Sequence, residues 1–406
     1  MSASETIIRI AAKGDGITQS GKFVSGAAPG DIVQADGTLE HGPHHQTPPC
    51  RHFGKCGGCQ LQHLDDEALS TFVRDRVAHA AEGQGMTPGK LAEPHVSPPQ
   101  SRRRVSLHAV NGGGKPSIGF REGGSHRLVD LRECHVMRAE LFAMIAPLRA
   151  FLARKKGKYA IDIELAIVDQ GVDCLIKGLT LEGLQESEAM ADFCRDNALA
   201  RMTLDQGYGA ETLWEPEPVS VTLGGVPVPY PAGTFLQATI DGEAALMAAA
   251  QEWLKDSRFV ADLFAGLGTF AFALAGDSKV LAAEAAQQAF LACKSAAGIS
   301  RKPVLAMHRD LFRNPIRAEE LKRFDAVVLD PPRAGAKEQI AQIVESGIAR
   351  VVYISCNPSS WARDSRSLAD AGYRLAELRP VGQFRWSTHV ELASFFLRED
   401  AEDLAG

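Results

Sequence analysis

Short apolar runs alternate with helical stretches in the part of the chain that follows Pro231. The runs consist mostly of Val, Leu, Ile, Ala and Phe, so strands formed by them would be buried on both faces. Buried strands that alternate with helices are typical of βαβ units, which build a parallel, doubly wound sheet. We therefore predict an α/β fold for residues 231–406, with strands at Phe259–Phe264, Lys279–Ala283, Ala326–Leu329 and Val351–Ile354.

The first half of the chain has a different pattern. Between residues 5 and 40, short alternating runs are separated by glycines, which predicts a very small β-barrel. From Val96 to about Pro231 the alternation is mostly that of strands, with one helix over 138–152. The predicted division is a small β-barrel in 1–45, a cysteine loop and a helix (65–81) in 46–95, a β-rich central domain in 96–230, and the α/β domain in 231–406.

The composition of the 406-residue chain is that of an ordinary globular protein, with 45% hydrophobic and 23% charged residues. No apolar run reaches the roughly 18 residues that a membrane helix requires, and the N-terminal residues lack the apolar segment of a secretory signal. We therefore expect a cytoplasmic protein without membrane contact. We further expect it to be a monomer. The formal net charge is −6, so contact with RNA would depend on local basic patches.

A glycine-containing turn follows the first predicted strand of the α/β domain. Gly266 and Gly268 let the backbone approach a ligand closely, and a helix beginning near Thr269 favours polar or negative groups at its N-terminus. Glu284 ends the next strand, where its carboxylate can accept hydrogen bonds from both hydroxyls of a ribose. This pattern predicts a nucleotide-type cofactor site, and it fits NAD as well as S-adenosylmethionine.

Two later carboxylates distinguish between these cofactors. Asp310 ends another apolar stretch and is suited to contact an adenine. Asp330 precedes Pro331 and Pro332, which stiffen the loop after the strand and fix the direction of the carboxylate. An acidic residue before Pro-Pro commonly lines the methyl-donor and base pocket of methyltransferases, and a dehydrogenase has no use for it. The sequence therefore favours S-adenosylmethionine.

Cys356 stands at the carboxyl end of a predicted strand, in the sequence Ser-Cys-Asn-Pro-Ser. Enzymes of the α/β class place their chemistry at this edge of the sheet. A thiol near a helix N-terminus has a lowered pKa and is a better nucleophile. A lone cysteine is more often a small buried apolar residue, but this context favours a catalytic thiol.

Methylation of carbon 5 of uracil requires such a thiol, because that carbon is too weakly nucleophilic to react directly. Addition of the thiolate to carbon 6 turns the ring into an enolate, and a base must later remove the proton from carbon 5. Glu391, in the sequence Thr-His-Val-Glu-Leu, has apolar neighbours that would raise its pKa. We predict that Glu391 is this base.

Three of the eight cysteines, Cys50, Cys56 and Cys59, lie within ten residues among several glycines. This spacing is typical of metal ligands and not of a disulfide scaffold. Cys134 is the best candidate for a fourth ligand, because the other cysteines lie within apolar patterns. Four thiolates suit zinc or an iron–sulfur cluster, and the spacing does not decide between them.

Together these motifs resemble the RNA uracil-5-methyltransferase family, in particular its iron–sulfur branch that acts on 23S ribosomal RNA. The resemblance covers nearly the whole chain. It implies a class I S-adenosylmethionine-dependent methyltransferase fold after residue 230 and a shortened TRAM/OB-like barrel in 5–40. The site residues that it implies are Cys356 as nucleophile, Glu391 as base, a 4Fe–4S cluster on Cys50, Cys56, Cys59 and Cys134, and a methyl-donor site made by Gln237, Phe264, Thr269, Glu284, Asp310 and Asp330.

The chain departs from the family pattern at Ala265, where many members have Cys, and at Arg385, where Phe-Pro is common. A target base must leave its stack to reach Cys356, and aromatic side chains hold such bases. Phe384 and Trp386 are the candidates for this contact. The candidates for phosphate contact are Arg51, Lys55 and the triplet Arg102, Arg103 and Arg104.

Two other functions fit parts of the pattern. The same reaction on the T-loop uridine of transfer RNA is the alternative within the family, although its typical bacterial transfer-RNA enzymes lack the cysteine cluster. A non-catalytic RNA-binding protein with a zinc module is the alternative from another class, and the presence of Cys356, Asp330 and Glu391 disfavours it. A cytosine-5-methyltransferase is disfavoured because Asp330-Pro-Pro lacks the second cysteine usual in those enzymes.

Overall fold

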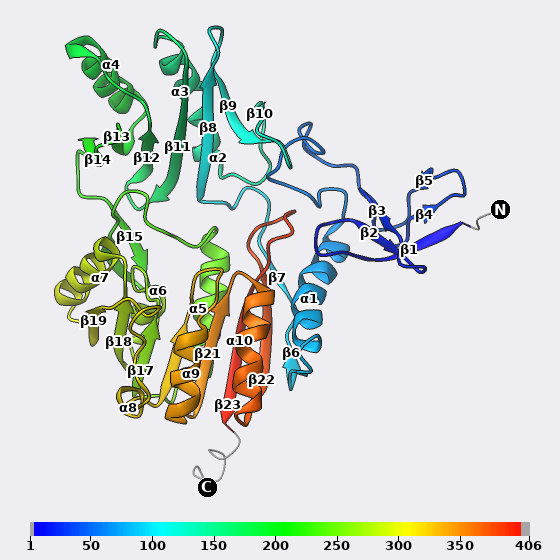
Figure 1. Cartoon of the computed structure of the whole chain (residues 1–406). Coiled ribbons are helices and arrows are strands. Elements are labelled where there is room, and N and C mark those ends of the chain that lie inside the picture. Colours follow the sequence, from blue (N-terminus) through cyan, green and yellow to red (C-terminus); the bar gives the residue numbers. More distant parts are fainter. Residues whose placement is uncertain (1–3, 399–406) are drawn as a thin grey trace.

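The computed structural model of the chain describes residues 4–398 (Figure 1). The outer ends of the first and last predicted domains, residues 1–3 and 399–406, lie outside these described residues. Within 4–398 the strands form sheets of five, seven, two and nine strands. The nine-stranded sheet occupies the C-terminal part of the chain, and the seven-stranded sheet stands beyond its upper end in the view of Figure 1.

The nine-stranded sheet has the order β19-β18-β17-β20-β21-β23-β22-β6, and β7 also pairs with β22. Strands β17 to β21 are parallel, and β23 is antiparallel to its two neighbours. The order reverses between β17 and β20, which is where open α/β sheets bind ligands. This confirms the predicted doubly wound α/β fold, whose strands are β17 (Phe259–Leu263), β18 (Lys279–Glu284), β19 (Val304–His308), β20 (Ala326–Leu329), β21 (Arg350–Ser355), β22 (Tyr373–Gly382) and β23 (Glu391–Arg398).

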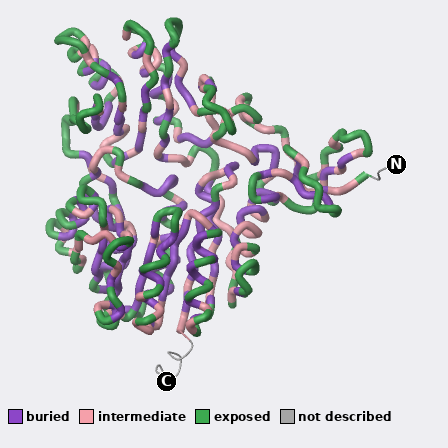
Figure 2. The backbone as a smooth tube through the Cα atoms, in the orientation of Figure 1, coloured by how far each residue is buried: buried purple, intermediate pink, exposed green. Residues whose placement is uncertain are grey.

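Helices cover both faces of this sheet, so the strands between them are buried (Figure 2). One apolar cluster joins the sheet to α5 (Ile240–Leu254), α6 (Thr269–Leu274) and α7 (Gln287–Ser300). The hairpin of β15 (Ser220–Leu223) and β16 (Val226–Pro229) belongs to this cluster as well. The other cluster joins the sheet to helices α1 (Asp66–Glu82), α8 (Ala318–Leu321), α9 (Lys337–Ser346) and α10 (Pro358–Asp370).

Helix α1 comes from the cysteine-rich part of the sequence but packs against α10 and β22. Its first turn is capped by Asp65, whose side chain accepts a hydrogen bond of 2.8 Å from the backbone N–H of Ala68. The two short strands that follow, β6 (Lys90–Leu91) and β7 (His95–Val96), run parallel to β22. The N-terminal part of the chain therefore completes one edge of the C-terminal sheet.

The central region forms the seven-stranded sheet, in the order β10-β9-β8-β11-β12-β13-β14. The helix predicted over 138–152 is interrupted at Met144. Pro147 has no N–H to donate to the preceding turn, which explains the break. The elements are β8 (Arg104–Asn111), β9 (Ser117–Arg121), β10 (Leu128–Asp130), α2 (Ala139–Ala143), α3 (Ile145–Leu152), β11 (Tyr159–Val168), β12 (Gly171–Lys177), α4 (Gly183–Asp196), β13 (Leu199–Asp205) and β14 (Ala210–Trp214).

The N-terminal strands form a small sheet that projects from the rest of the molecule (Figure 1). Its core consists of a few apolar side chains, among them Ile7 and Val33. Over the described residues, no helix combines the length and apolarity needed to cross a membrane. The strands are β1 (Glu5–Ile10), β2 (Gly16–Thr18), β3 (Phe23–Val24), β4 (Ile32–Val33) and β5 (Leu39–Glu40), in the order β3-β2-β1-β4-β5.

Candidate active site

The glycine-containing turn connects β17 to α6 at the carboxyl edge of the sheet. Phe264, Gly266 and Gly268 all have positive φ angles, of 63°, 56° and 92°. A Cβ on Gly268 would lie only 2.8 Å from the ring of Phe272, so this close packing of turn and helix requires glycine. Thr269 is the first residue of α6. The turn thus has the predicted form of a ligand-binding loop.

Glu284 lies against this turn at the end of β18. Its carboxylate accepts hydrogen bonds from the backbone N–H of Gly266 at 2.8 Å and of Ala286 at 2.6 Å. Asp310 follows β19, the next strand along the edge, and accepts from the N–H of Phe312 at 3.0 Å. The ring of Phe312 lies 5.3 Å from that of Phe264. The residues predicted to bind the methyl donor therefore follow neighbouring strands. The aromatic residue Phe312, which we had not predicted, lies beside them.

Asp330 and Gln237 come together from distant parts of the sequence. Asp330 follows β20, and its Oδ2 accepts a hydrogen bond of 3.1 Å from Nε2 of Gln237. Burial raises the pKa of Asp330 to about 7, and the hydrogen bond from Gln237 opposes this rise. Asp330 therefore carries a proton in part of the molecules near neutral pH.

Cys356 stands between β21 and α10, and Asn357 caps the helix by accepting from the N–H of Ser359. The lowered pKa that we expected for this thiol is wrong. Burial raises the pKa of Cys356 to about 11, and the carboxylates of Glu391 and Asp330 add to this effect. The positive charge of Arg333 acts in the opposite direction and lowers the pKa of Cys356. The position at the strand end is as predicted, but the thiol is protonated at neutral pH.

Glu391 is the first residue of β23, and only 3% of it is exposed. Burial, together with the charge of Asp330, raises the pKa of Glu391 to about 8, in the predicted direction. Gln383, at the end of the neighbouring strand, hydrogen-bonds to the Glu391 carboxylate and opposes this rise. The structure thus places the predicted nucleophile, the predicted base and Asp330 close enough to influence one another's ionisation.

Hydrogen bonds hold the loop that carries Arg333 beside Cys356. The carbonyl of Arg333 accepts a hydrogen bond of 2.9 Å from the side chain of Asn357, the residue after Cys356. Nη2 of Arg333 lies 3.0 Å from Nδ1 of His389, two residues before Glu391. Neither Arg333 nor His389 was predicted as a site residue. Their positions in Asp-Pro-Pro-Arg and His-Val-Glu were the available signal.

The four cysteines of the predicted metal site line one small cavity. Cys50, Cys56 and Cys59 come from the N-terminal loop, and Cys134 comes from the segment after β10. All four thiols are free of disulfides. Among residues 4–398, no group of three or more His, Cys, Asp or Glu side chains is arranged to hold a single metal ion. The remaining wall includes Phe120, Leu131, Val136 and Arg102.

The three arginines predicted to contact phosphate differ in their exposure. Arg103 is 5% exposed, and its guanidinium pairs with Glu243 at 2.5 Å. Arg102 lies over the ring of Phe384 and Arg104 over that of Phe235, 5.5 and 4.6 Å from the ring centres. Arg103 is thus occupied inside the protein, whereas Arg102 and Arg104 are half-buried and stay candidates for phosphate contact.

Trp386 is 4% exposed, so its ring cannot stack on an RNA base as predicted. Phe384 is half-buried and stays a candidate, with its ring against that of His389. Phe235 is an exposed aromatic residue near the site; it is 59% exposed and lies two residues before Gln237.

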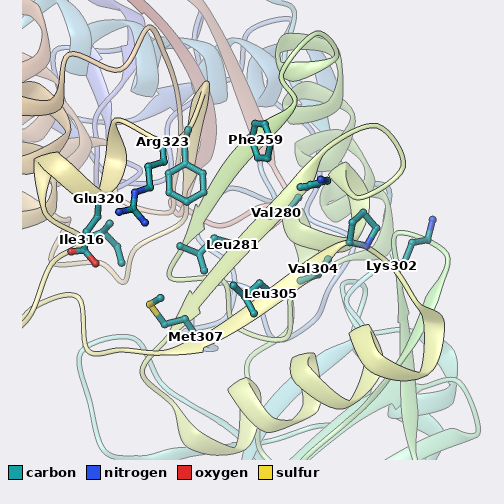
Figure 3. A pocket seen from close by; sticks show the side chains of 13 residues that line it. Phe259, Val280, Leu281, Lys302, Val304, Leu305, Met307, Ile316, Glu320 and Arg323 are labelled. Atoms are coloured by element: carbon teal, nitrogen blue, oxygen red, sulfur yellow. The ribbon is translucent and has the colours of Figure 1, made fainter.

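A second hollow lies away from this edge, where β17, β18 and β19 begin (Figure 3). Phe259, Leu281, Leu305 and Met307 line it. Its acidic side chain, Glu320, is paired with Arg309 at 2.9 Å. None of the predicted site residues lines this hollow, so it is not a candidate for the proposed chemistry.

Comparison with known proteins identifies similar sequences along the whole chain. Residues 230–399 match the model of the tRNA (Uracil-5-)-methyltransferase family. An uncharacterized RNA methyltransferase of Zymomonas mobilis is 48% identical over 97% of this chain and 99% of its own length. The 23S rRNA (uracil(1939)-C(5))-methyltransferase RlmD of Shewanella amazonensis is 29% identical, with 92% of this chain and 90% of its own covered.

Among solved structures, the tRNA (uracil-54, C5)-methyltransferase of Pyrococcus abyssi, in complex with S-adenosyl-L-homocysteine, has a similar fold. The TM-score is 0.75, at 21% sequence identity, over 97% of this chain and all of the other. The likeness extends over the N-terminal, central and C-terminal sheets together.

Proposed function

Because the chain belongs to the RNA uracil-5-methyltransferase family, we propose that it methylates carbon 5 of a specific uridine in 23S ribosomal RNA, with Cys356 as nucleophile. The class of the enzyme is an S-adenosylmethionine-dependent RNA (uracil-5-)-methyltransferase. The observation that carries the proposed mechanism is the grouping of Cys356, Glu391 and Asp330 at the carboxyl edge of the sheet.

The reaction begins with the thiol of Cys356. Its sulfur forms a bond to carbon 6 of the uracil, and the electron pair of the 5,6 double bond moves toward oxygen 4 to give an enolate. The thiol must first lose its proton to solvent, and the negative charge of the two neighbouring carboxylates disfavours this loss. Arg333 stabilises the thiolate, and its effect grows when RNA covers the site and excludes water.

Carbon 5 then attacks the methyl carbon of S-adenosylmethionine, and the bond from that carbon to the donor sulfur breaks. Glu391 takes the remaining proton from carbon 5, the 5,6 double bond re-forms, and the sulfur of Cys356 leaves carbon 6. A carboxylate whose pKa is about 8 is a stronger base than an ordinary one, provided that it is ionised at this step.

The donor site that we propose follows the carboxyl edge of the sheet. The backbone of the turn at Gly266 and Gly268 and the carboxylate of Glu284 would lie against the ribose part of the donor. Asp310 would contact the adenine, next to the rings of Phe264 and Phe312. Thr269, Gln237 and Asp330 complete the set, and the last two lie nearest to the base pocket.

We propose a 4Fe–4S cluster on Cys50, Cys56, Cys59 and Cys134. The fit rests on the donor set, since four free thiols from two chain segments face one cavity. A single zinc ion needs thiolates about 2.3 Å from one point. Four thiolates suit zinc as well as an iron–sulfur cluster, so the iron, sulfide and zinc content of the purified protein distinguishes the two. When bound, the cluster would tie the cysteine loop to the central sheet through metal–sulfur bonds.

Two observations support ribosomal RNA as the substrate. The relative from Shewanella amazonensis is named for position 1939 of 23S rRNA, and the cysteine set is that of the ribosomal branch by resemblance. The central region, residues 96–230, would contribute to RNA binding. The enzyme would work as a monomer in the cytoplasm. Transfer RNA is the alternative substrate, since the matched family model and the Pyrococcus abyssi enzyme are named for it.

The test is transfer of labelled methyl groups from S-adenosylmethionine to 23S ribosomal RNA and to transfer RNA, with anaerobically purified protein. We expect transfer to 23S RNA, loss of at least about 10³-fold in Cys356→Ala, and near-normal transfer in the control Cys194→Ala. Cys194 is buried in the core of the central region. RNA with 5-fluorouridine at the target should trap a covalent complex with the wild type, because fluorine replaces the proton that Glu391 removes.

The same preparation tests the cluster through its visible absorption and its iron and sulfide content, both of which Cys134→Ala should lower. Transfer to transfer RNA alone would assign the alternative substrate. A protein that binds zinc and transfers methyl groups to neither RNA would instead be an RNA-binding module.

A further inference from the structure

Gln383 is a buried amide at the centre of the site that the proposed mechanism leaves unused. It follows β22 directly, and 2% of it is exposed. Its surroundings leave little room for movement, because a Cβ on Gly242 would lie 2.7 Å from the Cβ of Gln383. Both ends of its amide group have hydrogen-bond partners. The side chain therefore has one defined orientation.

The backbone determines which end of this amide is the oxygen. The N–H of Ala238 can only donate, and it lies 2.9 Å from Oε1 of Gln383. The amide nitrogen must therefore point away from Ala238. It donates to Oε1 of Gln237 at 2.8 Å, and the side chain also hydrogen-bonds to the carboxylate of Glu391.

The orientation of Gln383 in turn determines the orientation of the Gln237 amide. Because Oε1 of Gln237 accepts from Gln383, its nitrogen faces Asp330 and donates to Oδ2 at 3.1 Å. One fixed N–H of the backbone thus orients two amides and the two carboxyl groups beside the nucleophile. A chain of amides with one fixed end has no freedom to reverse its donors and acceptors.

We propose that Gln383 is a positioning residue: it determines which groups of the base pocket donate hydrogen bonds and which accept them. The pocket thereby prefers uracil over cytosine. This inference rests on the proposed function, since it assumes that Cys356 attacks a pyrimidine at this edge. With its polarity fixed, Gln237 keeps an N–H and Asp330 keeps an oxygen for the base. Uracil presents an acceptor at position 4 and a donor at position 3, and cytosine presents the reverse.

Two substitutions separate polarity from packing. Gln383→Leu keeps the volume but removes the orienting groups, and Gln383→Glu keeps the shape and the acceptor for Ala238. When ionised, the introduced carboxylate has no proton to donate, so Gln237 should turn over and present its oxygen toward Asp330. When protonated, the new side chain can again donate to Gln237. If the leucine variant does not fold, the glutamate variant alone decides the question.

The matched control is Gln339, another buried glutamine (1% exposed), on α9. Its amide is bound at both ends by the backbone of Ile316, at 2.9 and 3.0 Å. Gln339→Glu and Gln339→Leu make the same chemical changes in a buried amide away from the base pocket. They should lower thermal stability but leave methyl transfer and base preference as in the wild type.

The measurement compares single-turnover methyl transfer to RNA with uridine or cytidine at the target position, between about pH 6 and pH 9. We expect Gln383→Leu to lower the rate with uridine about 10²-fold, as for a small misplacement of reacting groups, with the affinity for RNA nearly unchanged. The rate of Gln383→Glu relative to wild type should rise as the pH falls, and its uracil-to-cytosine ratio should shrink above neutral pH.

Rates within about twofold of wild type in both variants, with the same uracil-to-cytosine ratio at every pH, would overturn the proposal. A constant deficit without pH dependence or change in base preference would also overturn it, since a purely structural role predicts that result. Failure of the proposed function itself gives a different result, because Cys356→Ala would then transfer methyl groups as well as the wild type.

Discussion

At the scale of single residues, burial changes the chemistry of the site more than sequence context does. Glu391, Asp330 and Cys356 are ordinary ionisable groups in the sequence, yet all three favour their protonated forms in the fold. The helix N-terminus near Cys356 suggested the opposite for the thiol. Its effect is smaller than that of lost hydration and two nearby carboxylates. Without substrate, Cys356 and Glu391 therefore hold protons that they must lose before they can act as nucleophile and base.

This arrangement predicts how stability depends on pH. The pKa of Glu391 is raised from its ordinary value to about 8 in the folded protein. Its stabilising contribution is therefore complete below the unfolded pKa and is lost as the pH rises through about 8. From about pH 5.5 to about pH 8.5 the wild type should lose up to about 3 kcal/mol more unfolding free energy than Glu391→Gln. Urea unfolding of both proteins at the two pH values measures the difference, and parallel losses would contradict the raised pKa.

At the scale of elements, helix α10 holds the loop that carries Arg333. Asp364 of α10 accepts hydrogen bonds from the N–H of Ala336 at 2.7 Å and from the hydroxyl of Tyr353 at 2.8 Å. Arg363 donates to the carbonyl of Ala334 at 2.8 Å. Gly335 lies between these contacts with a φ of +85°. The loop after Asp330 is thus shaped by the helix that follows Cys356.

Substitution of Gly335 tests this contact between loop and helix. A Cβ at this position would lie 2.3 Å from Oδ2 of Asp364, and the backbone has a φ angle that alanine adopts only with strain. We expect Gly335→Ala to cost about 1–3 kcal/mol of unfolding free energy and to slow methyl transfer. Gly276→Ala is the control, because nothing lies within 4 Å of its Cβ position and its φ is unstrained. Equal melting temperatures for the two variants would disprove the contact.

Sequence patterns predicted the elements whose signals are local. The buried strands of the α/β domain, the helix near 65–81 and the strand-end position of Cys356 all follow from runs and caps that a short window contains. Pro147 was such a signal for the break between α2 and α3, and we missed it. The roles of Arg103 and Gln383 have no local signal. Arg103 pairs with Glu243, and Gln383 accepts from Ala238, each more than a hundred residues away, so these contacts depend on tertiary packing.

At the scale of the whole molecule, a buried ion pair joins the central and C-terminal sheets. Arg103 precedes β8, and its guanidinium contacts Glu243 of α5 and the carbonyl of Gln237. Both charged side chains are almost completely buried. The same contact therefore connects the sheet proposed for RNA binding to the backbone of the residue that hydrogen-bonds to Asp330.

A double-mutant cycle measures this connection. Arg103→Leu should cost about 3–5 kcal/mol of unfolding free energy, because it leaves the carboxylate of Glu243 buried without its partner. Adding Glu243→Leu should restore much of the loss, since an apolar pair avoids the cost of burying two charges. Chemical unfolding of the wild type, both single variants and the double variant gives the coupling. Additive losses would show that the pair does not act as a unit.

The pairing of β6 and β7 with β22 limits when the N-terminal part of the chain can fold during synthesis. Residues 90–96 leave the ribosome long before their partner, β22 (Tyr373–Gly382), has been translated. At ~5–20 residues per second the interval is on the order of tens of seconds. Until then, Leu69, Phe72, Val73 and Val77 of α1 have no sheet to pack against. The nascent chain must keep this apolar helix face from aggregating until almost the whole protein has been synthesised.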